Sequence, residues 1–229
     1  MIIINLLLIR SVIGFIILLL MTVLFRFGMR RKGAPAKTKP PLPHQIGAYL
    51  FCYILVAILA AIGIPALHDF DLNPLINLTP FAEIRTNYIE YMQNILLFIP
   101  FGFFLPLLWK RFEKPHRTLI FGALFSLSIE ILQLFTYRIT DIDDFFMNTL
   151  GTMIGYCLFV FARKIIPKLS VFSAGGADFS AGGADLWRRE PYFCFALAWI
   201  TMIFIEPYVF YGLMGPSAFA PGRDMIMLR

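Results

Sequence analysis

Residues 46–67 read IGAYLFCYILVAILAAIGIPAL, a run of 22 residues without a charged side chain. A helix rises about 1.5 Å per residue and needs about 20 mostly apolar residues to cross the hydrocarbon core of a bilayer. The sequence therefore predicts an all-α fold, a polytopic transmembrane helical bundle with about six spans. The five other runs are Ile2 to Phe25, Ile95 to Trp109, Leu119 to Phe135, Phe145 to Phe161 and Pro191 to Leu213.

The composition agrees with a lipid environment. Of the 229 residues, 59% are hydrophobic and 15% are charged, whereas a soluble domain has about 45–50% apolar and about 25% charged residues. The run that starts at Ile95 is short and contains Pro100 and Pro106, so we expect its helix to begin near Tyr91 and to bend at the prolines. Cysteines stand only within apolar runs and without CxxC spacing, which predicts buried hydrophobic residues and no disulfide or zinc site.

Basic residues indicate the orientation. Fifteen of the 20 Lys and Arg residues lie between positions 26 and 39, 110 and 117, or 163 and 189, which are alternate connections. The positive-inside rule places these connections in the cytoplasm and both termini outside. Arg10 within the first run, the basic residues after it and the lack of a small-residue cleavage site indicate a retained span. Topology explains the basic charge, so we expect no nucleic-acid partner.

Polar residues gather at the predicted outer ends of three consecutive spans. Glu130 and Gln133 are three residues apart and share one helix face. An ionisable group inside the bilayer is costly and is a functional-site hypothesis by default. The candidate polar site comprises Asn94, Glu130, Gln133, Arg138, Asp141, Asp143, Asp144 and Asn148.

Structural explanations compete with this hypothesis. The three aspartates are typical of a helix start, where carboxylates are favourable, and Arg138 would then only neutralise them. Glu130 and Gln133 would then form a structural interhelical hydrogen bond. Gly151 and Gly155 are expected to pack, since small residues four apart let a neighbouring helix approach closely.

At these residues the chain resembles the VanZ-like family of bacterial membrane proteins. The resemblance covers about residues 46 to 163 and rests on an ordered set of motifs: NLTPF at 77–81, NILLFIPFGF at 94–103, IEILQ at 129–133, Arg138, DIDD at 141–144, NTLG at 148–151 and GY at 155–156. It implies a multi-pass protein of the bacterial cell (inner) membrane and an envelope-related role. The name-giving member is associated with low-level resistance to the glycopeptide teicoplanin, and the candidate site residues match the family pattern.

The spans and the resemblance together predict four segments along the chain. Residues 1–45 hold the first span and a basic loop, and residues 46–163 a VanZ-like four-helix core. Residues 164–190 are predicted to be a cytoplasmic Gly/Ala linker, which carries SAGGAD twice, at Ser173–Asp178 and Ser180–Asp185. Residues 191–229 hold the last span, with Glu206 in its outer half, and an outer tail.

Three functions are compatible with the polar site. The first is a non-enzymatic protein that binds a lipid headgroup, a cell-wall precursor or the peptide part of an antibiotic, with Arg138 as a fork for phosphate or carboxylate. The alternative is a membrane enzyme acting on a lipid-linked phosphate or pyrophosphate, with carboxylates as acid, base or cation ligands. Neither a nucleophile–base pair nor a known catalytic motif supports that reading, so we favour the non-enzymatic function and expect no cofactor and no resident metal. A transporter with Glu130 as the titrating group ranks last, because the polar residues do not line a path to the cytoplasm.

Overall fold

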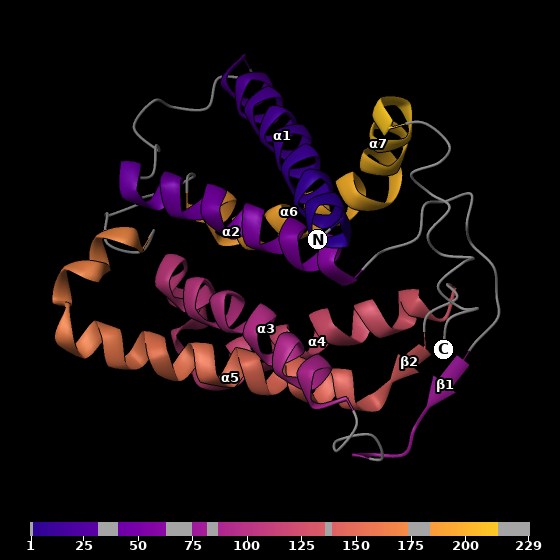
Figure 1. The fold of residues 1–229 in the computed structure, drawn as a ribbon. Coiled ribbons are helices and arrows are strands. Elements are labelled where there is room, and N and C mark those ends of the chain that lie inside the picture. The colour runs from indigo at the N-terminus through magenta and orange to yellow at the C-terminus, as the bar shows by residue number, and fades with distance from the viewer. Residues whose placement is uncertain are drawn as a thin grey trace.

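The computed structural model describes residues 2–31, 41–62, 75–81, 87–135, 139–173 and 184–214. It is an all-α bundle (Figure 1). The long helices are α1 (Ile2–Arg31), α2 (Leu42–Ile62), α3 (Tyr88–Leu108), α4 (Pro115–Gln133), α5 (Ile142–Ile165), α6 (Ala184–Ile200) and α7 (Glu206–Met214). Short 3₁₀ helices, η3 (Lys110–Glu113) and η4 (Pro167–Phe172), follow α3 and α5, and a π-helical turn (Thr201–Ile205) joins α6 to α7.

Four segments are long and apolar enough to cross a membrane: Leu42–Ile62, Tyr88–Leu108, Ile142–Ile165 and Arg189–Leu213. A shorter apolar helix covers Leu8–Val23 in α1. The expected fourth span forms a helix of 19 residues, α4, whose first turn holds Pro115, His116 and Arg117. With that polar turn, α4 is not among these four segments. The span count is therefore roughly as predicted.

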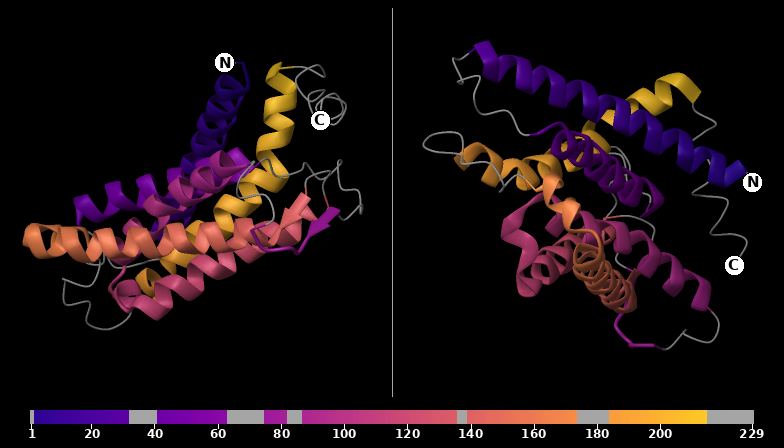
Figure 2. Two further views of the ribbon diagram at one scale, coloured as in Figure 1. Left: turned by 60° about the horizontal axis from the view of Figure 1, so that its bottom comes forward. Right: turned by 90° about the vertical axis from the view of Figure 1, so that its left-hand side faces the viewer.

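Helices α3, α4 and α5 lie alongside one another, while α1 and α7 rise from them at a steep angle (Figure 2). Two three-residue strands, β1 (Leu75–Asn77) and β2 (Ile139–Asp141), pair in parallel at one end, with Asn77 opposite Asp141. The sequence did not predict these strands. Pairing satisfies backbone groups in the described parts of two connections.

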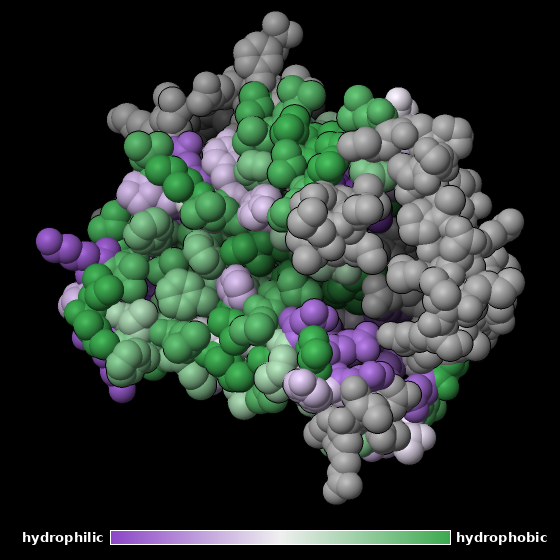
Figure 3. Space-filling model, viewed as in Figure 1, coloured by the Kyte–Doolittle hydropathy of each residue, from purple (hydrophilic) through white to green (hydrophobic). Residues whose placement is uncertain are grey.

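The two ends of the bundle differ in chemistry. We call the end with β1 and β2 the strand end. The opposite end, where α3 leads into α4 and α5 leads into η4, is the basic end, with Lys110, Arg111, Lys114, Arg117, Arg163, Lys164 and Lys168. A largely hydrophobic surface separates hydrophilic residues at the left-hand edge from those low on the right (Figure 3). A basic end opposite the strand end agrees with the predicted topology. Which end faces the cytoplasm stays a prediction.

Small residues let α3 and α5 come into backbone contact. A Cβ at Gly155 would overlap the carbonyl oxygen of Ile99, and one at Gly151 would overlap that of Ile95. Gly102 of α3 faces the backbone of Thr152 in the same way. The packing role predicted for Gly151 and Gly155 is confirmed, and it fixes how the polar first turn of α5 sits against α3.

Aromatic side chains fill the core between these helices and α2 and α6. Phe51, Phe98, Phe101 and Phe125 are fully buried, and Phe125 meets Phe195 of α6 with ring centroids 4.8 Å apart. Phe residues bury large apolar areas and, by their edge-to-face contacts, set the spacing of the helices. Pro100 and Pro106 both lie inside α3, which begins at Tyr88, three residues before the predicted start.

Three sequence-based expectations need correction or qualification. The cysteines are free as predicted, but only Cys52 and Cys194 are buried, whereas Cys157 is exposed on α5. The segment predicted to be a linker is helical at 167–172, and α6 already begins at Ala184. Most of both SAGGAD copies, and the tail after Met214, lie outside the described residues.

Candidate functional site

Asp143 connects three parts of the strand end. It lies in the first turn of α5 and is 1% exposed. Its Oδ2 accepts a hydrogen bond from the hydroxyl of Tyr91 on α3 at 2.6 Å. The backbone N–H of Phe81, after β1, lies 2.8 Å from Oδ2 and 3.0 Å from Oδ1. A buried carboxylate is tolerable only with such donors. Asp143 therefore holds two segments against α5: α3 and residues 78–81 after β1, which we call the β1 turn.

Asp141 caps α5 and closes the strand pair. Its Oδ1 accepts the N–H of Asp143 at 2.9 Å, which is an N-cap bond. Its Oδ2 accepts from Asn77 Nδ2 at 3.0 Å, across from it in the strand register. The N–H of Asp141 donates to Oε2 of Glu130 at 3.2 Å. Part of the helix-start explanation is thus correct, because Asp141 is a cap, but Asp143 does more than favour a helix terminus.

The other predicted residues lie on the same three helices. Asn94 of α3 donates from Nδ2 to Oδ1 of Asp144. Glu130 and Gln133 are both buried near the end of α4, and their three-residue spacing puts them on one helix face. Asn148, one turn beyond Asp144, is 2% exposed and donates from Nδ2 to the buried Ser126 Oγ at 3.0 Å. Arg138 lies outside the described residues, immediately before β2 in the sequence.

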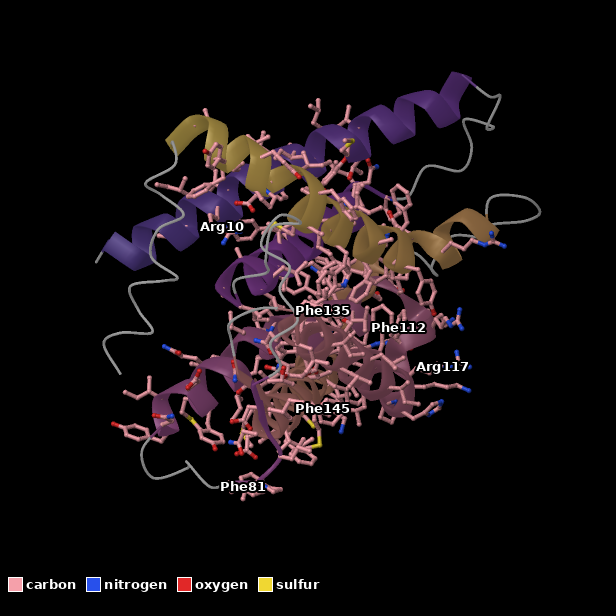
Figure 4. All side chains as sticks on the ribbon, turned by 90° about the vertical axis from the view of Figure 1, so that its right-hand side faces the viewer. Arg10, Phe81, Phe112, Arg117, Phe135 and Phe145 are labelled. Atoms are coloured by element: carbon pink, nitrogen blue, oxygen red, sulfur yellow. The ribbon has the colours of Figure 1, made fainter. Side chains whose placement is uncertain are left out.

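Sequence reasoning missed three participants: Asn77, Tyr91 and the backbone of Phe81. Tyr91 stands three residues before Asn94, so the shared helix face was a usable signal. Phe81 has a φ of 58°, a left-handed conformation that is costly for a bulky residue. Its N–H bond to Asp143 holds it there, and its ring stacks on Phe146 with centroids 6.4 Å apart. Figure 4 shows Phe81 at the lower edge of the molecule.

The carboxylates at the strand end serve mainly as hydrogen-bond acceptors. Each of the three aspartates, Asp141, Asp143 and Asp144, accepts a hydrogen bond from another segment. Their carboxylates therefore face different partners along the start of α5. Within the described residues, no three His, Cys, Asp or Glu side chains are arranged to hold a metal ion. The arrangement builds a hydrogen-bonded polar cluster, most of it buried, from α3, α4, α5 and the strand pair.

A second buried polar cluster lies at the basic end. His44 Nδ1 is 2.8 Å from the carbonyl oxygen of Phe172, and its Nε2 is 2.7 Å from Glu190 Oε2. Trp109 Nε1 donates to the same Glu190 oxygen at 3.1 Å. A carbonyl oxygen only accepts, so Nδ1 carries a proton, and one more proton must sit between Nε2 and Glu190. The cluster joins α2, α6, η4 and the end of α3, so both ends of the expected linker pack into the bundle.

An ion pair links the first and last helices. Arg10 of α1 donates from Nε and Nη2 to the two carboxylate oxygens of Glu206, each at 2.9 Å. Glu206 is fully buried, and the Arg10 guanidinium lies 5.6 Å from the ring centroid of Phe210. Gly14, one turn after Arg10, lets α1 pack closely on Met202 and Glu206. The sequence places opposite charges in two spans but carries no signal that pairs them.

An all-α bundle with apolar helices of membrane length and a hydrogen-bonded polar cluster at one end defines an integral membrane protein. The family model for VanZ/LLP1 matches residues 12–163, well over half of the chain, and the chain belongs to this family. That range holds every candidate site residue and also most of α1, which the sequence reading had left outside the resemblance.

One curated relative is Protein VanZ of Enterococcus faecium. It is 36% identical over 90 residues, which are 39% of this chain and 55% of that protein. The match thus spans about half the length of the relative. No solved structure matches the chain. Arg10 and Glu206 both fall outside the range of the family model.

Proposed function

We propose that this protein is a non-enzymatic component of the cell envelope that binds an anionic or polar group at the outer face of the cell membrane. We further propose that glycopeptide tolerance, as in teicoplanin resistance, is the resulting phenotype. The observation that carries the proposal is the polar network at the strand end, where donors from α3 and the β1 turn already occupy the aspartates. Groups that hold each other in place preorganise this end of the bundle, which lowers the cost of binding there.

Arg138 is the ligand-binding residue in this proposal. Between Arg117 and Arg163 it is the only Lys or Arg, and it stands directly before the strand that carries Asp141. A guanidinium binds carboxylate or phosphate with two parallel hydrogen bonds. The ligand class is therefore a carboxylate- or phosphate-bearing group, such as a lipid headgroup, a cell-wall precursor or the peptide part of an antibiotic. Phe81 and Phe146 add an aromatic face beside the Asp143 network.

The family supports the phenotype. The Enterococcus faecium relative is named Protein VanZ, and the family's name-giving member is associated with teicoplanin resistance. Catalysis has less support, since the carboxylates that an enzyme would need accept hydrogen bonds from Tyr91, Asn94, Asn77 and the Phe81 backbone.

The test is teicoplanin susceptibility in a Gram-positive host without a family member. Wild-type protein should raise the minimum inhibitory concentration, and Arg138→Ala should abolish the increase while Arg138→Lys retains part of it. Lys168→Ala, an exposed substitution at the basic end, is the charge-matched control and should behave as wild type. Immunoblots of the membrane fraction must show equal amounts. Full protection by Arg138→Ala would refute the role of Arg138, and no protection by the wild type would refute the phenotype.

A further inference from the structure

A groove lies at the basic end, far from the candidate polar site. It has a volume of about 310 Å³ and is lined by Glu113, Tyr156, Phe159, Val160, Arg163 and Lys164. One wall is the last two turns of α5, and the other is the end of η3. At about 30 Å³ per water molecule, the groove has room for a small polar headgroup.

The polar side of the groove carries net positive charge. Arg163 Nη1 pairs with Glu113 Oε1 at 2.6 Å and its guanidinium lies 5.8 Å from the ring centroid of Phe159. Yet 42% of the Arg163 side chain stays exposed, so further donors face outward. Lys164 is exposed. The one acid, Glu113, is held in place at its backbone, where the hydroxyl of Tyr156 donates to its carbonyl oxygen at 2.6 Å.

An apolar stripe leads to these cations. Met153 is 43% exposed and Cys157 is exposed. With Val160 of the groove lining, their spacing of four and three residues sets them on the groove side of α5. Lys164 follows Val160 by four residues and so stands at the end of this stripe. Apolar side chains followed by Lys and Arg match the profile of a lipid molecule, with acyl chains below and a phosphate above.

We propose that this groove is a binding site for an anionic glycerophospholipid of the leaflet at the basic end. Arg163 and Lys164 bind the phosphate, and the acyl chains lie along Met153, Cys157 and Val160. Two cations against one acid leave a net charge that suits a headgroup with one negative charge and disfavours a zwitterionic one. The proposal is independent of the strand-end site, so either can fail alone.

The test is native mass spectrometry of the full chain in a neutral detergent, titrated with phosphatidylglycerol or phosphatidylcholine. Wild-type protein should bind phosphatidylglycerol more tightly than phosphatidylcholine. The double variant Arg163→Gln/Lys164→Gln should weaken phosphatidylglycerol binding about tenfold. The matched control Lys110→Gln/Lys168→Gln removes the same charge at the same end but outside the groove, and should change the affinity less than about twofold.

Loss of the Glu113 ion pair could unfold the double variant, so Lys164→Gln alone provides a second readout, since it keeps that pair. It should weaken phosphatidylglycerol binding to an intermediate extent with an unchanged circular dichroism spectrum. Equal losses in the groove and control variants would overturn the proposal and indicate diffuse attraction. Equal affinity for both lipids, or displacement of phosphatidylglycerol by millimolar inorganic phosphate, would overturn it too.

Discussion

Asp143 accepts hydrogen bonds from both α3 and the β1 turn, so its loss should cost more than that of either donor. Asp143→Ala leaves Tyr91 and the Phe81 N–H without an acceptor, at about 1–3 kcal/mol for each buried group. Tyr91→Phe removes one bond and should cost about 1 kcal/mol. Thermal unfolding in one detergent should rank the variants in that order. Tyr88→Phe, at a tyrosine that is 60% exposed, is the control and should match wild type.

A lower midpoint for Tyr91→Phe than for Asp143→Ala would contradict this account, because it would mean that Asp143 does not join the two donors. An equal fall in the unfolding midpoint for Tyr88→Phe and Tyr91→Phe would also contradict it. It would show that loss of a tyrosine hydroxyl lowers stability whether or not that hydroxyl donates to Asp143.

Residue types and spacing predicted much of the strand-end cluster. Glu130 with Gln133 and Asp144 with Asn148 followed from helix periodicity, and the structure brings both pairs to one end. The hydrogen-bond partners did not follow, because Asn77 and Phe81 lie in a connection whose path depends on the β1–β2 pairing. A three-residue strand carries too little pattern to predict.

At the scale of elements, the contact between α3 and α5 depends on glycine. Gly155→Ala would push a Cβ into the Ile99 carbonyl, which is backbone and cannot move aside. The variant should lose several degrees of thermal stability or fail to fold, since overpacking of a tight contact costs about 1–3 kcal/mol or more. Gly212→Ala is the control, because a Cβ there meets nothing within 4 Å. It should be neutral or slightly stabilising, since Ala favours helix over Gly.

Comparable destabilisation by Gly155→Ala and Gly212→Ala, measured by size-exclusion profile and unfolding midpoint, would show that close helix approach is not what Gly155 provides.

The pair of Arg10 and Glu206 connects α1 to α7 and predicts non-additive mutants. Glu206→Leu alone leaves the Arg10 charge without its partner, which costs about 3–5 kcal/mol for a buried pair. The double variant Arg10→Met/Glu206→Leu removes both charges and should be more stable than either single variant. A double-mutant cycle on unfolding midpoints measures this coupling. Additive losses would mean that the two charges do not stabilise each other.

Helices were the most predictable elements, since a lipid environment allows few alternatives to them. Each of the six expected apolar runs is helical over most of its described residues, although α3 begins earlier than expected and the last helix runs through a π-helical turn at Thr201–Ile205. The partners of Arg10, His44 and Glu190 depend on how distant helices cross. Periodicity within one helix says nothing about that crossing.

At the scale of the whole molecule, the account depends on which end of the bundle faces the cell exterior. The strand end carries the candidate site and the basic end carries the lipid groove. Positive charge at alternate connections predicts that the strand end faces outward. If the orientation were reversed, Arg138 could not meet a cell-wall precursor or an extracellular antibiotic.

Cysteine labelling on intact cells tests this most directly. In a background without Cys52, Cys157 and Cys194, single cysteines would replace Thr79 at the strand end and Lys168 at the basic end, both exposed positions. A membrane-impermeant charged maleimide should label Thr79→Cys on intact cells and Lys168→Cys only after the membrane is disrupted. Labelling of Lys168→Cys on intact cells, with Thr79→Cys protected, would contradict the outward-facing site.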